Sequence, residues 1–189
     1  MRQKRITKDQ LQSIYRDHLS RDFITAELKS RSFFEDDFDR GVYFGDLFYD
    51  QDRLIAYTFY GKRPGGNYLL LDYLAVLPEE RSKGYGAEIL AALKKEAAAY
   101  DGVIVEAEAI DAAKDEQEQT IRRRRIAFYR QNGLKELKLR AEVNGVTFTL
   151  LLLTDKEKPA EEKIIKEELA AIYHTLYEHT EFKNAWRLF

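Results

Sequence analysis

The hydrophobic pattern is clearest in residues 68–99, where an apolar run, a glycine-containing bend and an amphipathic segment follow one another. Residues 69–77 form a nearly unbroken apolar run, as expected for a strand covered on both faces, and Pro78 ends it. Beyond Gly86, aliphatic side chains recur at helical spacing: Leu90, Leu93 and Ala97. The pattern therefore predicts a central strand, a tight bend and a helix with one buried face.

Strand and helix patterns also precede this central unit. Residues 5–7 predict a short edge strand, and Thr7 with Gln10 predicts a capping box at the start of a helix. That helix carries an apolar stripe of Leu11, Ile14, Tyr15 and Leu19. Residues 22–40 indicate a second helix through Phe33, Phe34 and Phe38. A hairpin is then predicted from two aromatic-rich runs, residues 42–49 and 54–60.

The pattern of residues after the central helix predicts a further strand, a helix and a hairpin. Residues 103–109 read as a strand in which Glu106 and Glu108 share one face. An acidic, polar connection over residues 111–120 leads to a helix that carries four consecutive arginines, 122–125. Asn-Gly at 144–145, between two apolar runs, predicts a tight two-residue turn.

The composition changes after residue 154, and we divide the chain there. Residues 1–154 are predicted to form the main domain, and residues 155–189 a C-terminal helical extension packed on the same domain. The extension carries an apolar stripe of Ile165, Leu169, Ile172 and Leu176. Three interpretations of it stay open: packing on its own domain, covering an active site, or forming a homodimer interface. His174 and His179 have too little support as ligands, so no metal site is predicted.

Composition and charge exclude several classes of protein. Charged residues make up 34% of the chain but nearly balance, with a net charge of −2, so no global field favours nucleic acid or an anionic membrane. The absence of cysteine excludes disulfides, a thiol nucleophile and thiolate metal sites. No apolar run is long enough to span a bilayer or to serve as the core of a signal peptide. We therefore expect a cytoplasmic protein without nucleic-acid or membrane partners.

The basic run at residues 122–125 has two interpretations. The preferred one is a solvated helix face whose charge offsets the acidic connection before it. The alternative is contact with a phosphate or a nucleic acid, which would make binding steeply dependent on salt.

The bend after the central strand suits a bound phosphate group. Gly84 and Gly86 allow a tight turn and a close approach of the backbone to a ligand. The first amides of the following helix have no partners inside it, and the positive end of the helix dipole lies there. Arg81 and Lys83 add positive charge. An ordinary connection between strand and helix carries about equal weight on this evidence alone.

Two motifs give a more specific indication. Residues 81–86, Arg-Ser-Lys-Gly-Tyr-Gly, resemble the Gln/Arg-x-x-Gly-x-Gly/Ala signature of the GNAT N-acetyltransferases, and residues 74–78 match the Leu-Ala-Val-x-Pro that often precedes it. Residues 128–134 resemble the Phe-Tyr-x-x-x-Gly-Phe segment of the same family. The motifs stand in the right order and at the right separation. The resemblance covers residues 52–153 well and the N-terminal third loosely.

The resemblance implies an α/β fold of the α+β type, with a GNAT-like mixed, mostly antiparallel central sheet, flanking helices and an extra C-terminal helix. It also implies acetyl-CoA as the donor and a small-molecule or peptide amine as the acceptor. In the family, two neighbouring parallel strands separate and the pantetheine arm inserts between them; here these are residues 69–77 and 103–109. Backbone groups of Leu74, Ala75 and Val76 would then bind pantetheine. The pyrophosphate would be held by Arg81, Ser82, Lys83, Gly84, Tyr85, Gly86 and Ala87.

Candidate catalytic residues follow from the same resemblance. Tyr129 stands at the family's tyrosine position and would protonate the departing thiolate; without the resemblance, a core aromatic is the preferred interpretation. Glu106 is the first choice for the general base, with Glu108 and Asp72 behind it, because neighbouring carboxylates raise each other's pKa. The alternative for the two glutamates is a solvated strand end. Asp72, placed on the same face as Leu70 and Leu74, completes an acidic triplet that suggests a cationic acceptor.

The function predicted from these features is acetyl transfer from acetyl-CoA to an amine by direct attack in a ternary complex. A different class of protein remains as an alternative. It is a non-catalytic acyl-CoA-binding module that regulates a partner and uses its C-terminal helix as the interaction surface.

Overall fold

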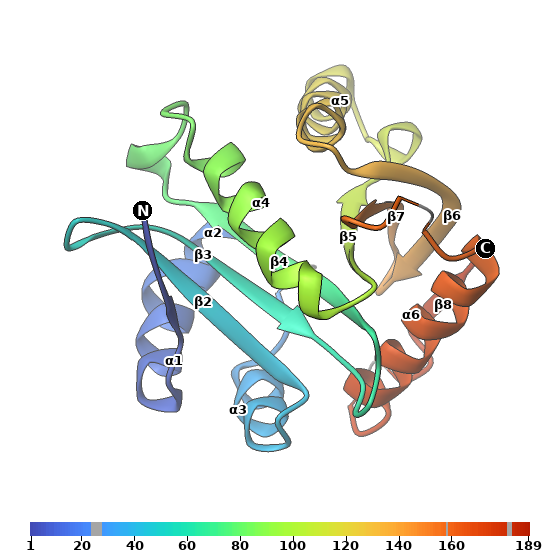
Figure 1. Ribbon diagram of the computed structural model, residues 1–189, viewed down its shortest axis with the longest axis horizontal. Coiled ribbons are helices and arrows are strands. Elements are labelled where there is room, and N and C mark those ends of the chain that lie inside the picture. The colour runs from blue at the N-terminus through green and yellow to red at the C-terminus, as the bar shows by residue number, and fades with distance from the viewer. Residues whose placement is uncertain (24–27, 158, 181–182) are drawn as a thin grey trace.

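The computed structural model describes residues 1–23, 28–157, 159–180 and 183–189. Its described strands form one sheet in the order β1-β2-β3-β4-β5-β7-β6-β8 (Figure 1). Their bounds are β1 Arg2–Arg5, β2 Tyr43–Asp50, β3 Arg53–Gly61, β4 Tyr68–Val76, β5 Gly102–Glu108, β6 Lys135–Val143, β7 Val146–Leu153 and β8 Trp186–Leu188. Only β4 and β5 pair in parallel among them. The mixed, mostly antiparallel sheet predicted from the sequence is confirmed.

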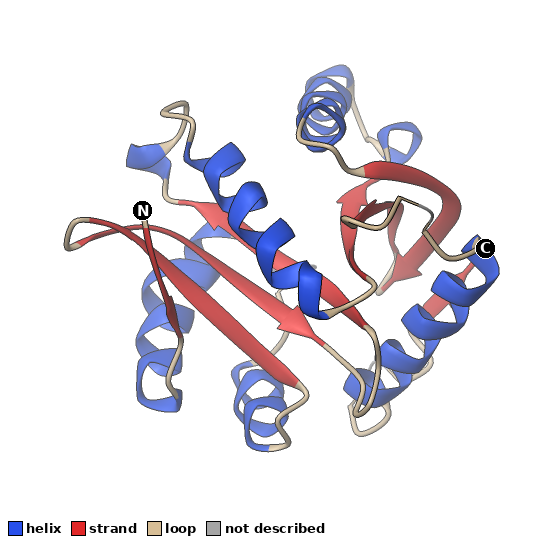
Figure 2. Cartoon of the chain, viewed as in Figure 1, coloured by secondary structure: helices blue, strands red, loops and turns tan. Residues whose placement is uncertain are grey.

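Helices cover both faces of this sheet (Figure 2). Their bounds are α1 Lys8–Ile14, a π-helical turn Tyr15–Leu19, α2 Ser20–Asp22, α3 Arg31–Asp39, α4 Tyr85–Glu96, α5 Glu116–Gln131 and α6 Glu162–Tyr177. One hydrophobic cluster joins α1, α3 and α6 to the sheet through residues such as Leu11, Phe34 and Leu169. The other joins α4 and α5 to the opposite face through Leu90 and Ile126. The aliphatic residues of the apolar stripes predicted from the sequence for the segments that form α1, α4 and α6 are buried.

Local signals explain where several elements begin. The predicted capping box of Thr7 and Gln10 is present at the start of α1, so the edge strand must end before it and runs over Arg2–Arg5 rather than residues 5–7. The second predicted helix is narrower than residues 22–40, because Ser30 caps α3 by accepting a hydrogen bond from the Phe33 amide (3.2 Å). Residues 24–27 of that interval lie outside the described residues.

The Asn-Gly turn between β6 and β7 is confirmed. Asn144 and Gly145 have φ values of 49° and 78°, the left-handed conformation that a two-residue hairpin turn requires at both central positions. Val143 and Val146 face each other across the turn. The sequence therefore sets the register of this hairpin.

The predicted acidic connection over residues 111–120 is wrong in its second half. Helix α5 begins at Glu116, because Asp115 accepts a hydrogen bond from the Glu118 amide (2.7 Å) while Glu118 accepts one from the Lys114 amide (2.6 Å). The acidic side chains are the start of the helix, where the dipole favours negative charge.

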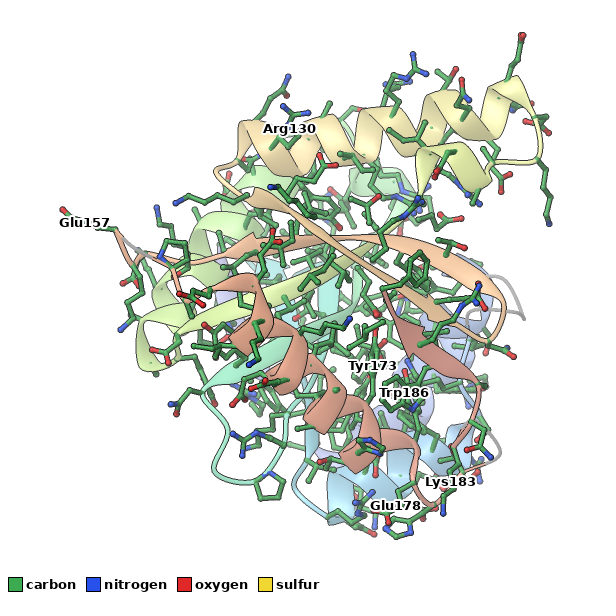
Figure 3. The ribbon with its side chains drawn as sticks, turned by 90° about the vertical axis from the view of Figure 1, so that its right-hand side faces the viewer. Arg130, Glu157, Tyr173, Glu178, Lys183 and Trp186 are labelled. Atoms are coloured by element: carbon green, nitrogen blue, oxygen red, sulfur yellow. The ribbon has the colours of Figure 1, made fainter. Side chains whose placement is uncertain are left out.

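The C-terminal segment packs on the sheet. Helix α6 lies across the strands, and Tyr173 of α6 contacts Trp186 of β8 with ring centroids 5.1 Å apart and ring planes tilted by 57° (Figure 3). The apolar stripe predicted for this helix is buried throughout. Strand β8, which pairs with β6 through Ala141 and Leu188, was not predicted, since a three-residue strand carries no readable alternation. The division at residue 154 stays a prediction.

A β-bulge interrupts the central strand at Asp72. Phe59 pairs with Tyr73 and Tyr60 with Leu71, so Asp72 has no partner on β3. The bulge changes the alternation of side chains. The expectation that Asp72 shares a face with both Leu70 and Leu74 is therefore half wrong: Leu70 packs in the cluster under α3 and α6, whereas Leu74 packs in the cluster under α4 and α5.

Candidate active site

The two parallel strands separate directly behind this bulge. Their pairing runs from Tyr68 opposite Gly102 to Leu71 opposite Val105 and stops there. Beyond that point β4 continues to pair with β3, and β5 continues to pair with β7. The strand edges that face each other over residues 72–76 and 106–108 thus have backbone groups without a strand partner, as the resemblance to the GNAT family implied.

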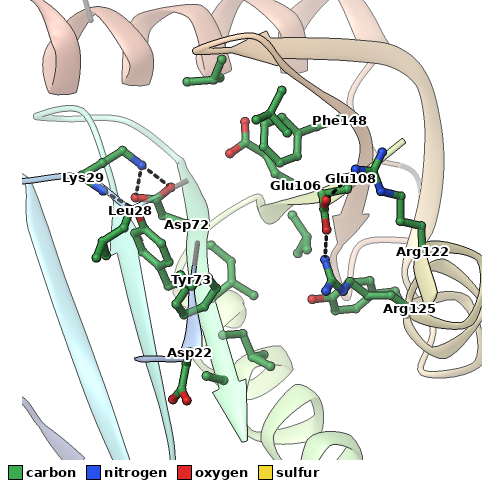
Figure 4. A pocket seen from close by; sticks show the side chains of 18 of the residues that line it. Asp22, Leu28, Lys29, Asp72, Tyr73, Glu106, Glu108, Arg122, Arg125 and Phe148 are labelled. Atoms are coloured by element: carbon green, nitrogen blue, oxygen red, sulfur yellow. Dashed lines mark hydrogen bonds and ion pairs between the residues drawn. The ribbon is translucent and has the colours of Figure 1, made fainter. Parts of the chain in front are cut away.

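A cavity of about 550 Å³ opens at this separation (Figure 4). Leu74, Val76 and Tyr129 line it from the face that carries α4 and α5. Tyr73 and Tyr177 line it from the face that carries α3 and α6. The cavity therefore passes through the plane of the sheet, and a molecule on each face could reach the same point.

Asp72 is held in a buried ion pair rather than free in the cavity. The Lys29 ammonium lies 2.6 Å from both of its carboxylate oxygens (Figure 4). The Tyr43 hydroxyl donates a further hydrogen bond to Asp72. Burial alone would lower the pKa of Lys29, but the charge of Asp72 outweighs it and raises that pKa above its ordinary value. The carboxylate oxygens of Asp72 are thus already bound by Lys29 and Tyr43.

Glu108 is also neutralised. Arg122 lies 2.8 Å and Arg125 2.5 Å from its carboxylate oxygens. Arg122 is buried, and it also donates to the Ala109 carbonyl (2.8 Å) and pairs with Glu118 (2.9 Å). The expected solvated face over residues 122–125 is therefore wrong for Arg122, which the buried Glu108 draws inward.

Glu106 differs from both, because within the described part of the chain it forms no ion pair. Tyr173 of α6 donates a hydrogen bond to its carboxylate. Burial, reinforced by the negative charge of Asp72, raises the pKa of Glu106 to about 7, although the Tyr173 bond and Lys29 oppose this. A carboxylate with this pKa can accept a proton near neutral pH.

Tyr129 lines the same cavity from α5. It sits on the last turns of α5, and its ring is buried against Phe128 with centroids 5.6 Å apart. Burial raises the pKa of its hydroxyl, an effect that the charge of Arg125 partly offsets. The hydroxyl therefore stays protonated at neutral pH and can donate a proton.

The bend before α4 has the geometry that a bound phosphate needs. Gly84 has φ +89°, a left-handed conformation that non-glycine residues rarely adopt, and no side chain caps the first turn of α4. A Cβ at Gly86 would lie 3.0 Å from the ring of Phe128, so glycine allows α4 and α5 to pack closely. The amides at the start of α4 are thereby left available to an anion.

The elements at this separation, β4, β5, α4 and α5, lie within the part of the chain that matches a known family. Residues 9–134, which run from α1 through α5, match the model of the acetyltransferase (GNAT) family. The chain belongs to the GNAT family. No curated protein matches this GNAT chain in sequence. Membership confirms the expected acyltransferase activity.

Solved structures share the fold of this GNAT protein. A GNAT-family protein from Bacteroides thetaiotaomicron, assigned as an acetyltransferase, superposes with a TM-score of 0.72 at 18% identity over 94% of this chain and 98% of that one. A spermidine N-acetyltransferase chimera of Vibrio cholerae SpeG and hSSAT gives 0.59 at 12% identity over 81% and 96%. An aminoglycoside 6′-N-acetyltransferase complexed with coenzyme A gives 0.58 at 18% over 85% and 100%. At these identities the likeness concerns the fold alone.

The predicted site residues of the GNAT domain fall into two groups. Eight of them line the cavity: Asp72, Leu74, Ala75, Val76, Arg81, Glu106, Glu108 and Tyr129. The others lie beside it, in the bend and the first turn of α4: Ser82, Lys83, Gly84, Tyr85, Gly86 and Ala87. Two of the bend's side chains have partners inside the protein, since Lys83 pairs with Glu80 (2.9 Å) and Tyr85 donates to Asp50 (2.8 Å). The bend is therefore suited to bind through its amides rather than through these side chains.

Sequence reasoning missed three residues that set the charges of the GNAT cavity. Lys29 pairs with Asp72, Arg122 pairs with Glu108, and Tyr173 bonds Glu106. A signal existed only for Arg122, which stands four residues after Glu118 on the same helix face. The described residues contain no group of histidines and carboxylates that could hold a metal ion, and no described helix could cross a membrane.

Proposed function

We propose that the protein transfers the acetyl group of acetyl-CoA to a primary amine by direct attack within a ternary complex. The observation that carries this proposal is the cavity through the sheet at the separation of β4 and β5. Its lining includes residues from both faces of the sheet, so the two substrates would approach one point from opposite faces. It requires no covalent acyl-enzyme, and the chain has no cysteine to form a thioester.

The donor side of this proposal rests on the bend and on the open edge of β4. The amides of residues 82–87 would hold the pyrophosphate at the start of α4. The backbone of Leu74, Ala75 and Val76 would accept and donate hydrogen bonds along the pantetheine arm, as an added strand does. Arg81, which already donates to the Val76 carbonyl (3.1 Å), closes the cavity at this end.

In this proposal two residues transfer protons: Glu106 on strand β5 acts as the base and Tyr129 on helix α5 acts as the acid. Glu106 takes a proton from the attacking amine as the new C–N bond forms, and the C–S bond then breaks. Tyr129 donates its proton to the departing thiolate, whose parent thiol has a pKa of about 8.5. The products are the acetamide and free coenzyme A, with the proton of Glu106 returned through solvent to Tyr129.

Glu106 is favoured over Glu108 and Asp72 because the other two are neutralised by cations. Their oxygens are already bound by ammonium and guanidinium groups of the protein, so they are not open to a substrate amine. Tyr129 is favoured as the acid because its hydroxyl lines the cavity on the donor side, and because within the described part of the chain it forms no hydrogen bond.

Cellular context is proposed from the sequence. A balanced charge and the absence of a long apolar run support a cytoplasmic protein that acts on a small-molecule or peptide amine without a membrane or nucleic-acid partner. A homodimer interface is compatible with the free edges of β1 and β8.

The test replaces Tyr129 with phenylalanine and measures release of free coenzyme A from acetyl-CoA with a panel of primary amines. Tyr129→Phe should lower kcat by about 100-fold, because general acid catalysis supplies a factor of that order, while the affinity for coenzyme A measured by calorimetry stays within about twofold. Tyr100→Phe, a half-buried tyrosine away from the cavity, is the matched control and should keep full activity. Binding of coenzyme A without amine-dependent release in the unmodified protein would instead favour a non-catalytic acyl-CoA-binding module.

A further inference from the structure

Lys29 occupies a site built for an organic cation. Its ammonium contacts the Asp72 carboxylate and lies 5.0 to 5.5 Å from the centroids of three aromatic rings, those of Phe33, Tyr73 and Tyr177. The side chains of Lys29 and Asp72 are only 9% and 4% exposed. A carboxylate surrounded by aromatic faces binds ammonium groups well, and here the protein's own lysine fills the place.

Three other carboxylates that line the cavity also form ion pairs with arginines of the protein. Glu108 is paired with Arg122 and Arg125, and Glu118 is paired with Arg122. Asp22 pairs with Arg21 (3.0 Å). Within the described part of the chain, Glu106 is thus the one carboxylate of the cavity that is left without an ion pair.

The described lining from the segment after α2 and from the β6–β7 hairpin is mostly apolar, with Asn144 as the polar side chain of the hairpin. Five half-buried side chains from the segment after α2 and from the β6–β7 hairpin face the cavity: Phe23, Leu28, Val143, Val146 and Phe148. Such a surface gains free energy from covering the apolar part of a ligand, and none of its described residues carries a carboxylate that could pair with a second ammonium group.

We propose that the acceptor is a primary amine with a single positive charge on an apolar body, and that Lys29 excludes diamines and polyamines by occupying the second cation site. This inference rests on the proposed function and names the substrate class of the same cavity. The reacting amine approaches Glu106, its apolar body lies against the hairpin, and a second ammonium would meet the charge of Lys29. Lys29 is therefore a specificity-determining residue that takes no part in the chemical step.

The first experiment compares two amines with the same number of non-hydrogen atoms, heptylamine and hexamethylenediamine, which differ only in a terminal methyl or ammonium group. Initial rates of coenzyme A release give kcat/KM for each, and calorimetry gives their affinities for the protein loaded with coenzyme A. The unmodified protein should favour heptylamine by about tenfold or more in both measurements, because two like charges in a partly buried site repel strongly.

The second experiment removes the lysine charge. Lys29→Met leaves Asp72 and the aromatic rings as an empty cation site, so the diamine should gain at least about tenfold relative to heptylamine. Lys29→Met combined with Asp72→Asn removes both charges and should give no such gain, and Lys29→Arg should keep the original preference. The matched control is Lys62→Met, another lysine over an aromatic ring (5.7 Å from Phe44) but outside the cavity lining, which should leave the ratio unchanged.

The outcomes separate this inference from the proposed function. Coenzyme A release that is equally fast with both amines, or faster with the diamine, overturns the inference and leaves the proposed function standing. A Lys29→Met protein that folds and shows no relative gain for the diamine overturns the role of Lys29. If Lys29→Met does not fold, the comparison of the unmodified protein with Lys29→Arg still decides the preference for one charge. Release with neither heptylamine, hexamethylenediamine nor any other primary amine overturns the proposed function itself.

Discussion

Glu106 has the environment that an amine-directed base requires. Its carboxylate sits where β4 and β5 part, it is bonded by Tyr173, and it has Asp72 close enough to add negative potential. The two other candidate carboxylates are held by cations that also line the cavity, Asp72 by Lys29 and Glu108 by Arg122. One strand thus carries two glutamates with different roles, set by what faces each of them.

The pH dependence of the reaction should report this base. Because burial raises the pKa of Glu106 to about 7, the deprotonated form accumulates as the pH rises through that value. We expect kcat/KM for the amine to show a break near pH 7, and Glu106→Gln to remove the break and lower the rate by about 100-fold. The measurement is a pH–rate profile of both proteins. An unchanged break in the variant would assign it to another group.

The hydroxyl of Tyr173 should influence the pKa of Glu106. Its hydrogen bond favours the charged form of Glu106, so Tyr173→Phe should raise the pKa of that carboxyl and move the break in the profile to higher pH. The ring contact with Trp186 is kept in this variant, and the loss of stability should be about 1 kcal/mol. A break that stays in place or moves to lower pH contradicts the assigned contact.

At the scale of single residues, the sequence indicates which carboxylates are candidates for the site but not which cations pair with them. The spacing of Glu106 and Glu108 places both on one strand face, and Asp72 stands out in an apolar run. Lys29 comes from a segment that the family resemblance covers only loosely, and its pairing with Asp72 spans 43 positions of sequence. Contacts of this kind depend on the assembled fold, so the charge of the cavity could not be read from residue order.

Among the elements, the bend before α4 and the bulge in β4 position the site. The Asp72 bulge directs both Asp72 and Tyr73 to the acceptor side, and the pairing with β5 ends one residue earlier. The left-handed Gly84 then turns the chain so that α4 begins beside the open strand edge. Both features are short departures from regular structure at the functional site.

Gly84→Ala tests the bend. Alanine in a left-handed conformation costs about 1–2 kcal/mol, so unfolding should occur at lower denaturant concentration, and coenzyme A should bind more weakly because the α4 amides shift. Gly65→Ala is a matched control: its φ is +67°, a Cβ there also meets no atom within 4 Å, and it lies away from the cavity. The control should lose similar stability and no affinity. Equal affinities in the two variants would contradict the role of the bend.

Element prediction succeeded where the signal is local. The capping box at Thr7, the Asn-Gly turn and the alternating strand over β5 are each encoded by neighbouring residues. The bulge was not foreseen, because an apolar run reads the same with or without one extra residue. Its effect on the direction of Leu74 appears only through pairing with β3.

At the scale of the whole molecule, α6 contributes to the wall of the candidate site although it lies outside the residues matched to the family. It buries Leu169 and Leu176 against the sheet and supplies Tyr173 and Tyr177 to the groups around the cavity. The extension that the sequence separates by composition is joined to the rest through the same core.

One buried and one exposed residue of α6 can be substituted to test whether the extension unfolds together with the rest of the molecule. Leu169→Ala removes a fully buried side chain and should cost about 2–5 kcal/mol in the free energy of unfolding, whereas Ile164→Ala, at 47% exposure, should change it by no more than about 0.5 kcal/mol. Denaturant unfolding followed by two probes measures both. A separate early transition in Leu169→Ala, with the remainder unaffected, would mean that the extension unfolds on its own.

The most direct test of the account is the initial-velocity pattern with acetyl-CoA and a primary amine varied together. A cavity that brings both substrates to one point through the sheet predicts intersecting lines in double-reciprocal plots, because both must be bound before the acetyl group moves. Parallel lines, which indicate that the protein carries the acetyl group after coenzyme A has left, would contradict it.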